Sequence, residues 1–179
     1  PAEIGCRYLF EGKLKTPLRY PGGKSRAVKH ILPHIPEDIE RLVSPFFGGG
    51  SLELAIAARG TEVRGYDKMK QLVWFWQALC GDNNKLADEV QNLRTEYWIE
   101  EKGELADDAP LRKLWLQENG ADKLVEGCNK ECFTNFREQL KDPSFMFSYE
   151  KAAKYYAINR ASFSGATFSG GWSKRASYA

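Results

Sequence analysis

The sequence has few histidines and cysteines and no long hydrophobic run. Its 179 residues include two His and four Cys, and only Cys128 and Cys132 lie close together, without a pair of histidines nearby. This pattern argues against a zinc site and favours free thiols in a reducing compartment. No apolar run approaches the roughly 20 residues of a membrane span, and residues 1–15 lack the pattern of a signal peptide. We therefore expect no bound metal, no membrane partner and no secretion.

Acidic residues are absent from the carboxyl-terminal part of the sequence. Residues 151–179 contain five Lys or Arg and no Asp or Glu, and residues 1–30 contain seven Lys or Arg and two acids. Residues 81–108, in contrast, contain nine acids and three bases. The net charge of +2 therefore hides two basic ends around an acidic middle. The pattern predicts that the ends share a face that meets a polyanion, although a solvated surface would have the same composition.

The most informative stretch is a glycine turn between two predicted strands. Residues 41–45 have the pattern of a short buried strand, and the sequence Ser-Pro-Phe-Phe-Gly-Gly-Gly-Ser follows. Residues 51–59 are predicted to form a helix that Gly60 ends. Residues 61–66 are predicted to form a second strand with Asp67 at its carboxyl end. This order is typical of the first half of a nucleotide-binding α/β unit, in a chain long enough to bury a core.

Each part of this unit has a physical reason to bind a ligand. Glycines let the backbone approach a ligand closely, because no side chain stands in the way. The start of the following helix offers unpaired backbone N–H groups and a partial positive charge. The Asp67 carboxylate can accept hydrogen bonds from both hydroxyls of a ribose. The turn is not GxGxxG, so a dinucleotide is not favoured, and a tight turn without a ligand would have the same pattern.

A second turn lies earlier in the sequence. Leu-Arg-Tyr-Pro-Gly-Gly-Lys at residues 18–24 precedes a helix predicted over residues 25–32, with Ser25 as its cap. Tyr20 offers a flat ring and Lys24 a cation for a ligand. An ordinary turn with an exposed lysine would have the same sequence.

The two turns together resemble the amino-terminal half of the Dam-type (D12 class, alpha group) DNA adenine N6-methyltransferases. The resemblance implies an α/β, Rossmann-like S-adenosylmethionine-dependent methyltransferase fold with an incomplete sheet and a helical target-recognition insert. It implies methyl transfer from S-adenosyl-L-methionine to N6 of adenine in DNA. The cofactor-binding residues that it implies are Tyr20, Pro21, Gly22, Gly23, Lys24, Pro45, Phe46, Phe47, Gly48, Gly49, Gly50, Ser51 and Asp67.

The acid-free carboxyl-terminal part is similar to the DNA-contacting segment of that family. A helix predicted over residues 145–159 runs into Asn-Arg and then into a loop of Ser, Gly and aromatic residues. In the family, the arginine meets phosphate and an aromatic ring presses into the base stack. A flexible glycine–serine loop is the other interpretation. The double-stranded DNA contacts that the resemblance implies are Arg19, Asn159, Arg160, Phe163, Ser164, Lys174 and Arg175.

The segment between these motifs is predicted to be helical. Residues 69–79 form an aromatic helix in which Trp74, Phe75 and Trp76 are consecutive, so we expect two of them in the core and one against a neighbouring element. Further helices are predicted over residues 84–101 and 121–140, with a polar break at residues 103–110. The predicted parts of the chain are residues 1–80 for the cofactor, 81–158 for the helical insert, and 159–179 for the DNA-contacting loop.

The catalytic Asp/Asn/Ser-Pro-Pro-Tyr/Phe/Trp motif of the family does not occur in the sequence. Asp142-Pro143-Ser144-Phe145 differs from it at the third residue and precedes the Asn-Arg pair, so we interpret Asp142 as a helix cap. The catalytic residues are therefore unknown. We expect an amino-terminal portion that is inactive or incomplete alone, with a second chain as one source of the catalytic half.

Two rival functions are compatible with parts of the pattern. A non-catalytic nucleic-acid-binding remnant would keep the basic ends. A nicotinamide-dependent oxidoreductase would share the glycine turn and the ribose acid, but it gives the Tyr20–Lys24 turn no role. In the methyltransferase interpretation, the expected location is the cytoplasm of a bacterial cell or of a phage or viral host cell.

Overall fold

A small mixed sheet forms one end of the protein. The computed structural model describes residues 3–6, 15–102, 128–142 and 146–173. In these residues the sheet contains β1 (Glu3–Cys6), β2 (Arg41–Ser44) and β3 (Glu62–Tyr66), in the order β1-β3-β2. The central strand β3 pairs parallel with β2 and antiparallel with β1. The sequence predicted β2 and β3 but not β1.

The unit from β2 to β3 confirms the predicted order of strand, glycine turn, helix and strand. Helix α2 spans Ser51–Ala57 and packs on both strands. Gly60 has a φ of +89°, the left-handed conformation that a residue after a helix often adopts and that glycine tolerates best. The expectation of a buried first strand is wrong, because β2 is an edge strand of the described sheet and Val43 is 56% exposed.

Helix α3 (Lys70–Gly81) lies at the centre of the protein and carries much of its core. It contacts β1, α4 (Asn83–Lys102) and α8 (Tyr149–Ala161). Because neighbours surround the helix, all three consecutive aromatic residues, Trp74, Phe75 and Trp76, are buried. Phe75 and Trp76 belong to the main cluster of buried hydrophobic residues, whereas Trp74 is 8% exposed and lies outside that cluster, in line with the expectation of two core residues and one elsewhere.

The last two helices begin later than the sequence predicted. Helix α7 spans Lys130–Gln139, and it begins there because the Asn129 side chain accepts a hydrogen bond from Cys132 N (2.8 Å). Residues 103–127 lie outside the described residues, so the polar break and the first part of this predicted helix lie there. Helix α8 is capped by Ser148, whose hydroxyl accepts from Lys151 N (3.2 Å). Asp142 therefore does not cap α8, and residues 143–145 lie outside the described residues.

The helix predicted over residues 25–32 is shorter than expected. Only Val28–Ile31 form α1, and the 3-10 turn η1 (Leu32–His34) follows. The N-cap is Ala27, without a side-chain cap. Ser25 is therefore not a helix cap, and its hydroxyl instead bonds the hydroxyl of Ser51.

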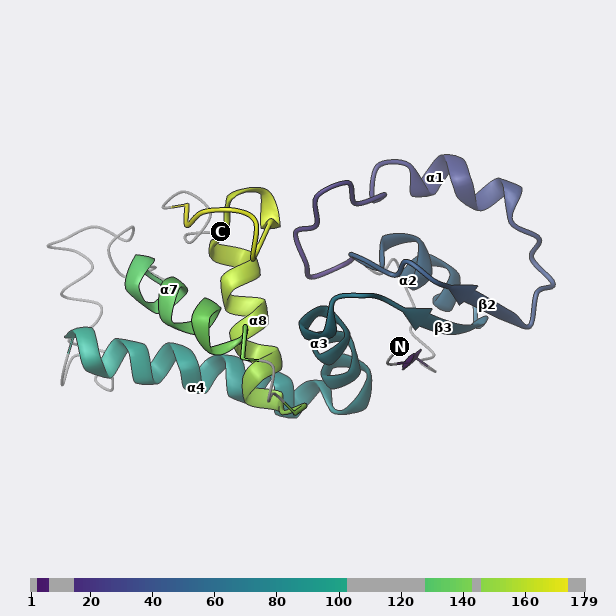
Figure 1. Ribbon diagram of the computed structural model, residues 1–179. Coiled ribbons are helices and arrows are strands. Elements are labelled where there is room, and N and C mark those ends of the chain that lie inside the picture. Colours follow the sequence, from purple (N-terminus) through teal and green to yellow (C-terminus); the bar gives the residue numbers. More distant parts are fainter. Residues whose placement is uncertain (1–2, 7–14, 103–127, 143–145, 174–179) are drawn as a thin grey trace, which may run out of the picture.

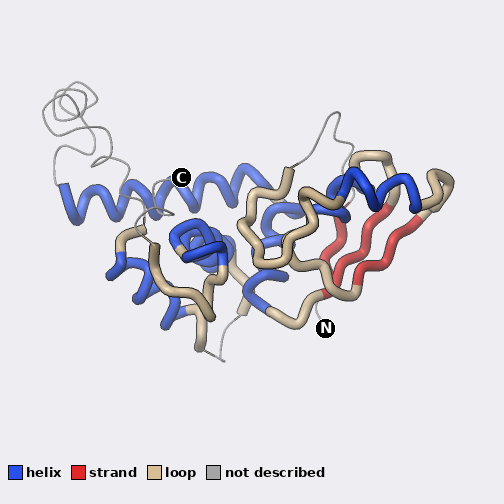
Figure 2. The backbone as a smooth tube through the Cα atoms, turned by 90° about the horizontal axis from the view of Figure 1, so that it is seen from above, coloured by secondary structure: helices blue, strands red, loops and turns tan. Residues whose placement is uncertain are grey.

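The arrangement separates a sheet end from a helical end (Figures 1 and 2). The strands lie with α1 and α2 at one end, α4, α7 and α8 lie at the other, and α3 stands between them. None of the described helices is both long and apolar enough to cross a membrane. Cys80 in α3 is disulfide-bonded, which corrects the expectation of free thiols at this residue, whereas Cys128 and Cys132 are free.

Candidate functional site

The structure brings the two glycine-rich segments together. The Tyr20 ring lies against the turn, since a Cβ added to Gly49 would come within 2.7 Å of Tyr20 Cβ and one added to Gly48 within 3.0 Å of Tyr20 Cε1. The hydroxyls of Ser25 and Ser51 are 2.8 Å apart. Two segments that are separate in the sequence therefore form one surface beside the start of α2.

Asp67 is the residue that fixes the glycine turn. Its Oδ2 accepts a hydrogen bond from Gly48 N (2.9 Å), and its Oδ1 accepts one from Met69 N (3.0 Å) at the start of α3. The carboxylate is half-buried at the carboxyl end of β3. A carboxylate oxygen has two lone pairs, so each oxygen can accept a further hydrogen bond from a ligand.

The glycines serve the packing of the protein's own rings. Gly48, Gly49 and Gly50 are buried, and a Cβ at Gly50 would come within 2.7 Å of the rings of Phe47 and Trp76. Trp76 also donates from Nε1 to Gly48 O (3.0 Å). The absence of side chains in the turn therefore makes room for Tyr20, Phe47 and Trp76, a role that the sequence pattern did not indicate.

The two phenylalanines of the turn differ in their exposure to solvent. Phe47 is 3% exposed and packs edge-on against Trp76, with ring centroids 5.0 Å apart. Phe46 is 88% exposed. Of this pair, only Phe46 can offer a ring to a ligand.

An open pocket of about 1020 Å³ lies beside Asp67. Pro45, Phe46 and Asp67 line it, together with residues that the sequence analysis did not select, among them Lys68, Trp74 and Phe147. The position of Lys68 directly after the strand-end acid was a usable signal in the sequence. The other two could not be selected, because the sequence did not indicate which of the three aromatic residues of α3 lies outside the core and because Phe147 is distant in the chain.

The rest of the first turn is open to solvent. Residues 21–24 are exposed, and Gly22 adopts a φ of +74°. Lys24 Nζ donates to Gly22 O (2.8 Å). Tyr20 is half-buried, and burial, followed by the negative charge of Asp67, raises the pKa of its hydroxyl. The Tyr20 hydroxyl is therefore a neutral hydrogen-bonding group at physiological pH.

A buried polar pair links the segments on the two sides of the glycine turn. Ser44 Oγ donates to Glu53 Oε1 (2.7 Å), and both residues are buried. The pair joins the end of β2 to the first turn of α2, on the two sides of the glycine turn. Sequence analysis missed it, because Glu53 looked like an ordinary acid at a helix start.

The predicted DNA-contacting loop folds back on α8. Phe163 N donates to Gly171 O (2.9 Å) and Ser173 N donates to Ala161 O (2.9 Å), which closes the loop. Next to this closure, Phe163 is 68% exposed, and Ser164 is exposed with a φ of +53°. Lys174 and Arg175 lie outside the described residues.

Two arginines meet next to this loop. Arg19 donates from its guanidinium to Arg160 O (3.2 Å). Burial lowers the pKa of Arg19, and the positive charge of Arg160 lowers it further. Two neighbouring cations make this part of the surface favourable for a phosphate.

Asn159 lies inside the protein. It is fully buried, and its side chain bonds the backbone of Arg19 and of Gly165. The DNA contact that the sequence analysis gave to Asn159 stays a prediction. The burial of its side chain supports a role in positioning its neighbours.

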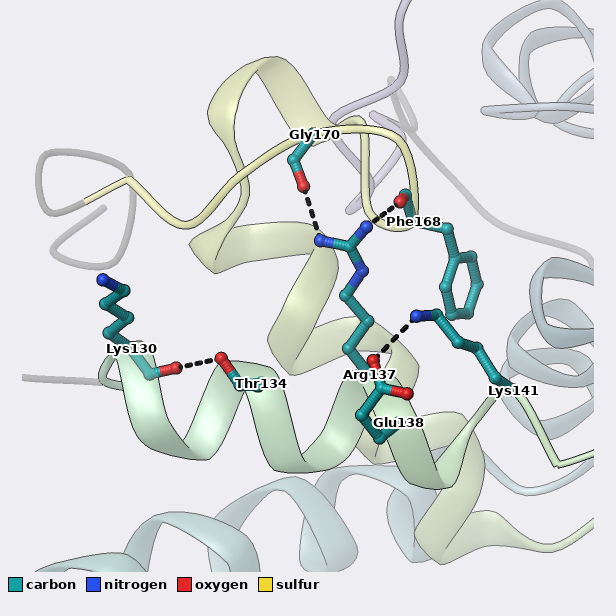
Figure 3. Close-up of polar contacts among 7 residues, drawn as sticks. All are labelled: Lys130, Thr134, Arg137, Glu138, Lys141, Phe168 and Gly170. Atoms are coloured by element: carbon teal, nitrogen blue, oxygen red, sulfur yellow. Dashed lines mark hydrogen bonds and ion pairs between the residues drawn. The ribbon is translucent and has the colours of Figure 1, made fainter.

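Arg137 of α7 supports the other side of the loop (Figure 3). Its guanidinium donates to Gly170 O (3.1 Å) and also to Phe168 O. Trp172 Nε1 adds a hydrogen bond to Cys128 O (3.0 Å). The loop is therefore fastened to α7 and to the segment before it as well as to α8.

Replacement of Arg137 by methionine should loosen this side of the loop. The variant keeps much of the apolar stem but removes both charged hydrogen bonds, so we expect the free energy of unfolding to fall by about 2 kcal/mol. Urea denaturation followed by circular dichroism measures the change. Lys130→Met on the same helix is the control, because only its backbone carbonyl takes part in a described bond. Equal stabilities of the two variants would contradict the supporting role of Arg137.

Taken together, these features give an α/β protein with an open pocket at the carboxyl ends of two parallel strands and with two neighbouring arginines next to the loop that follows α8. In the described residues, no group of three or more His, Cys, Asp or Glu side chains is placed to hold a metal ion.

Residues 20–174 match the family of D12 class N6 adenine-specific DNA methyltransferases, and the chain belongs to this family. It is therefore a member of an enzyme family that methylates N6 of adenine in DNA. No curated protein matches the chain.

Proposed function

We propose that this chain binds S-adenosyl-L-methionine at the turn between β2 and α2 and supplies the cofactor-binding and DNA-binding part of an enzyme that methylates adenine in double-stranded DNA. The observation that carries the proposal is the position of Asp67, which joins the glycine turn to the start of α3 and borders the open pocket. An acid at this place can bind the two hydroxyls of a ribose. When bound, S-adenosylmethionine supplies an electrophilic methyl group on sulfur.

The chemical groups around Asp67 match the base and the carboxylate of this cofactor. The exposed Phe46 ring and Trp74 give the pocket aromatic walls for a base, and Lys68 adds a cation at its edge. The exposed backbone of residues 21–24 and the Lys24 ammonium face solvent near the start of α2 and suit a carboxylate. Pro45 also lines the pocket. Four further residues shape the two turns beside it through their packing and hydrogen bonds: Gly23, Gly49, Gly50 and Ser51.

We place DNA along Arg19, Arg160, Phe163 and Ser164. The two arginines bring positive charge together, and the exposed Phe163 ring at the start of the loop can press into a base stack. An enzyme that acts on a base must take that base out of the helix, and an inserted ring stabilises the opened stack. Lys174 and Arg175 are proposed as further phosphate contacts.

We also propose, from the family and the described fold, how the chain divides into parts and where it acts. We assign residues 1–80 to a Rossmann-like cofactor part, 81–158 to a helical target-recognition insert, and 159–179 to DNA contact. The open edge of β2 supports a second chain that adds strands to the described sheet. DNA as the substrate supports a location in the cytoplasm of a bacterial, phage-infected or virus-infected cell.

Replacement of Arg160 by alanine should weaken DNA binding by about tenfold through loss of one charged contact. The slope of log K against log salt should become shallower by about one, because one fewer counterion is released. Fluorescence anisotropy with a labelled duplex over a salt series measures both effects. Lys141→Ala, which removes a cation at the end of α7 that pairs with Glu138, is the control and should leave the slope unchanged. An unchanged slope in Arg160→Ala would remove this residue from the phosphate contacts.

The test of the proposal joins two measurements on the purified chain. Calorimetric titration with S-adenosylmethionine measures cofactor binding, and a tritiated-methyl assay with unmethylated duplex DNA measures transfer. We expect cofactor binding without methyl transfer by the chain alone, because the catalytic motif of the family does not occur in the sequence. Transfer to adenine would show that the chain has its own catalytic residues, with Asp142 as the first residue to replace. DNA binding without any cofactor binding would instead favour a non-catalytic nucleic-acid-binding module.

A further inference from the structure

The Asn159 side chain pairs with both backbone groups of one distant residue. Its Oδ1 accepts a hydrogen bond from Arg19 N (3.0 Å), and its Nδ2 donates to Arg19 O (2.7 Å). Nδ2 also donates to Gly165 O (3.2 Å). A carboxamide carries a donor and an acceptor side by side, so it can satisfy this backbone as an aspartate of the same shape cannot.

The loop backbone lies directly against Arg19 at the same place. A Cβ added to Gly165 would come within 2.0 Å of Arg19 O, and Gly165 adopts a φ of +72°. Both facts require glycine at this position. Arg19 and the loop therefore meet through backbone groups, with the buried amide of Asn159 as the connecting piece.

From Arg19 the contacts continue into the cofactor turn. Tyr20 follows Arg19 in the chain and places its ring against Gly48 and Gly49. Gly48 N in turn donates to Asp67. A continuous series of contacts thus leads from the strand-end acid Asp67 to Gly165 in the DNA-contacting loop.

We infer that Asn159 is a positioning residue that couples the two binding surfaces, so that cofactor binding strengthens DNA binding and DNA binding strengthens cofactor binding. The inference rests on the proposed function, because it assigns the cofactor to the Tyr20 side and DNA to the loop side. A ligand that orders Tyr20 against the glycine turn also fixes Arg19, and Asn159 transmits this order to Gly165. Thermodynamic linkage requires the same factor in both directions.

The test measures the affinity of the full chain for a labelled unmethylated duplex, without and with saturating S-adenosylhomocysteine. We expect the wild-type chain to bind the duplex roughly tenfold more tightly with the cofactor product present. In Asn159→Asp, which keeps the shape and Oδ1 but removes the Nδ2 donor, this ratio should fall toward one. Direct titration with S-adenosylhomocysteine, without and with the duplex, should give the same ratio for each protein.

A matched control separates coupling from simple support of the loop. Arg137→Met weakens the other side of the same loop, so it should lower DNA affinity while the ratio stays near the wild-type value. Gly165→Ala separates Arg19 from the loop without a change to Asn159, and it should lower the ratio as Asn159→Asp does. It also carries the test if circular dichroism shows that Asn159→Asp does not fold.

The outcomes of this test separate the inference from the proposed function. A wild-type chain that binds neither ligand contradicts the proposed function. A wild-type chain that binds both ligands with a ratio of one overturns the coupling alone. A folded Asn159→Asp or Gly165→Ala that keeps the full ratio also overturns it.

Discussion

Replacement of Gly65 by alanine is expected to lower the free energy of unfolding by about 3 kcal/mol, through overpacking in the core. The added Cβ would lie 2.0 Å from Cδ2 of the Phe47 ring and 2.6 Å from its Cε2. The ring cannot easily move aside, because it is 3% exposed and packs against Trp76. Urea denaturation, followed by tryptophan fluorescence and circular dichroism, measures the loss.

Gly171→Ala is the matched control for this prediction. Both glycines have φ values that alanine accepts, but a Cβ at Gly171 meets nothing within 4 Å. We expect the control to change the free energy of unfolding by less than about 0.5 kcal/mol. Because Phe47 directly precedes Gly48, Gly65→Ala should also weaken cofactor binding. Two variants of equal stability would show that Phe47 does not occupy the space beside Gly65.

The local part of this fold could be predicted from the sequence. The glycine turn, the helix after it and the strand that ends at Asp67 depend on neighbouring residues, such as Gly60 as a helix stop. These elements appear as β2, α2 and β3 within one or two residues of the predicted bounds. The helix predicted over residues 25–32 is present but begins only at Val28, and the Ser25 hydroxyl bonds that of Ser51 rather than capping the helix.

Elements that depend on distant partners could not be predicted. Strand β1 is four residues long, and its place is set by pairing with β3 about sixty residues later. The burial of all three aromatic residues of α3 likewise depends on the helices that surround it. Periodicity within one segment gives no information about such neighbours.

The same division applies to the candidate site. The glycine turn and Asp67 could be predicted from the sequence as candidate ligand-binding residues, because each residue type has a local reason to bind a ligand. The contact of Tyr20 with the glycines and the pairing of Asn159 with Arg19 could not, since the latter joins residues 140 positions apart. Asn159 stood beside Arg160 in a polar segment, and nothing in that segment indicates that its amide faces inward.

Asp67→Ala is expected to weaken binding of S-adenosylhomocysteine by about 3 kcal/mol, roughly a hundredfold in Kd. The variant removes the acceptors that we propose for both ribose hydroxyls and releases Gly48 N from its fixed position. Calorimetry at a temperature well below unfolding measures the loss. Asp82→Ala is the control, because Asp82 also accepts a backbone N–H, from Lys85, but at an exposed position at the start of α4. It should leave the Kd within about twofold.

A ligand variant separates the ribose contact from the structural role of Asp67. Asp67 also accepts from Met69 N at the start of α3, so a loss of affinity in Asp67→Ala has two sources. The 2′-deoxy form of S-adenosylhomocysteine removes one hydroxyl from the ligand while the protein stays intact. If Asp67 binds that hydroxyl, the wild-type chain should lose affinity for the deoxy ligand, and Asp67→Ala should bind both ligands alike. An equal loss in the two proteins would place the ribose elsewhere and leave Asp67 only with the task of shaping the turn.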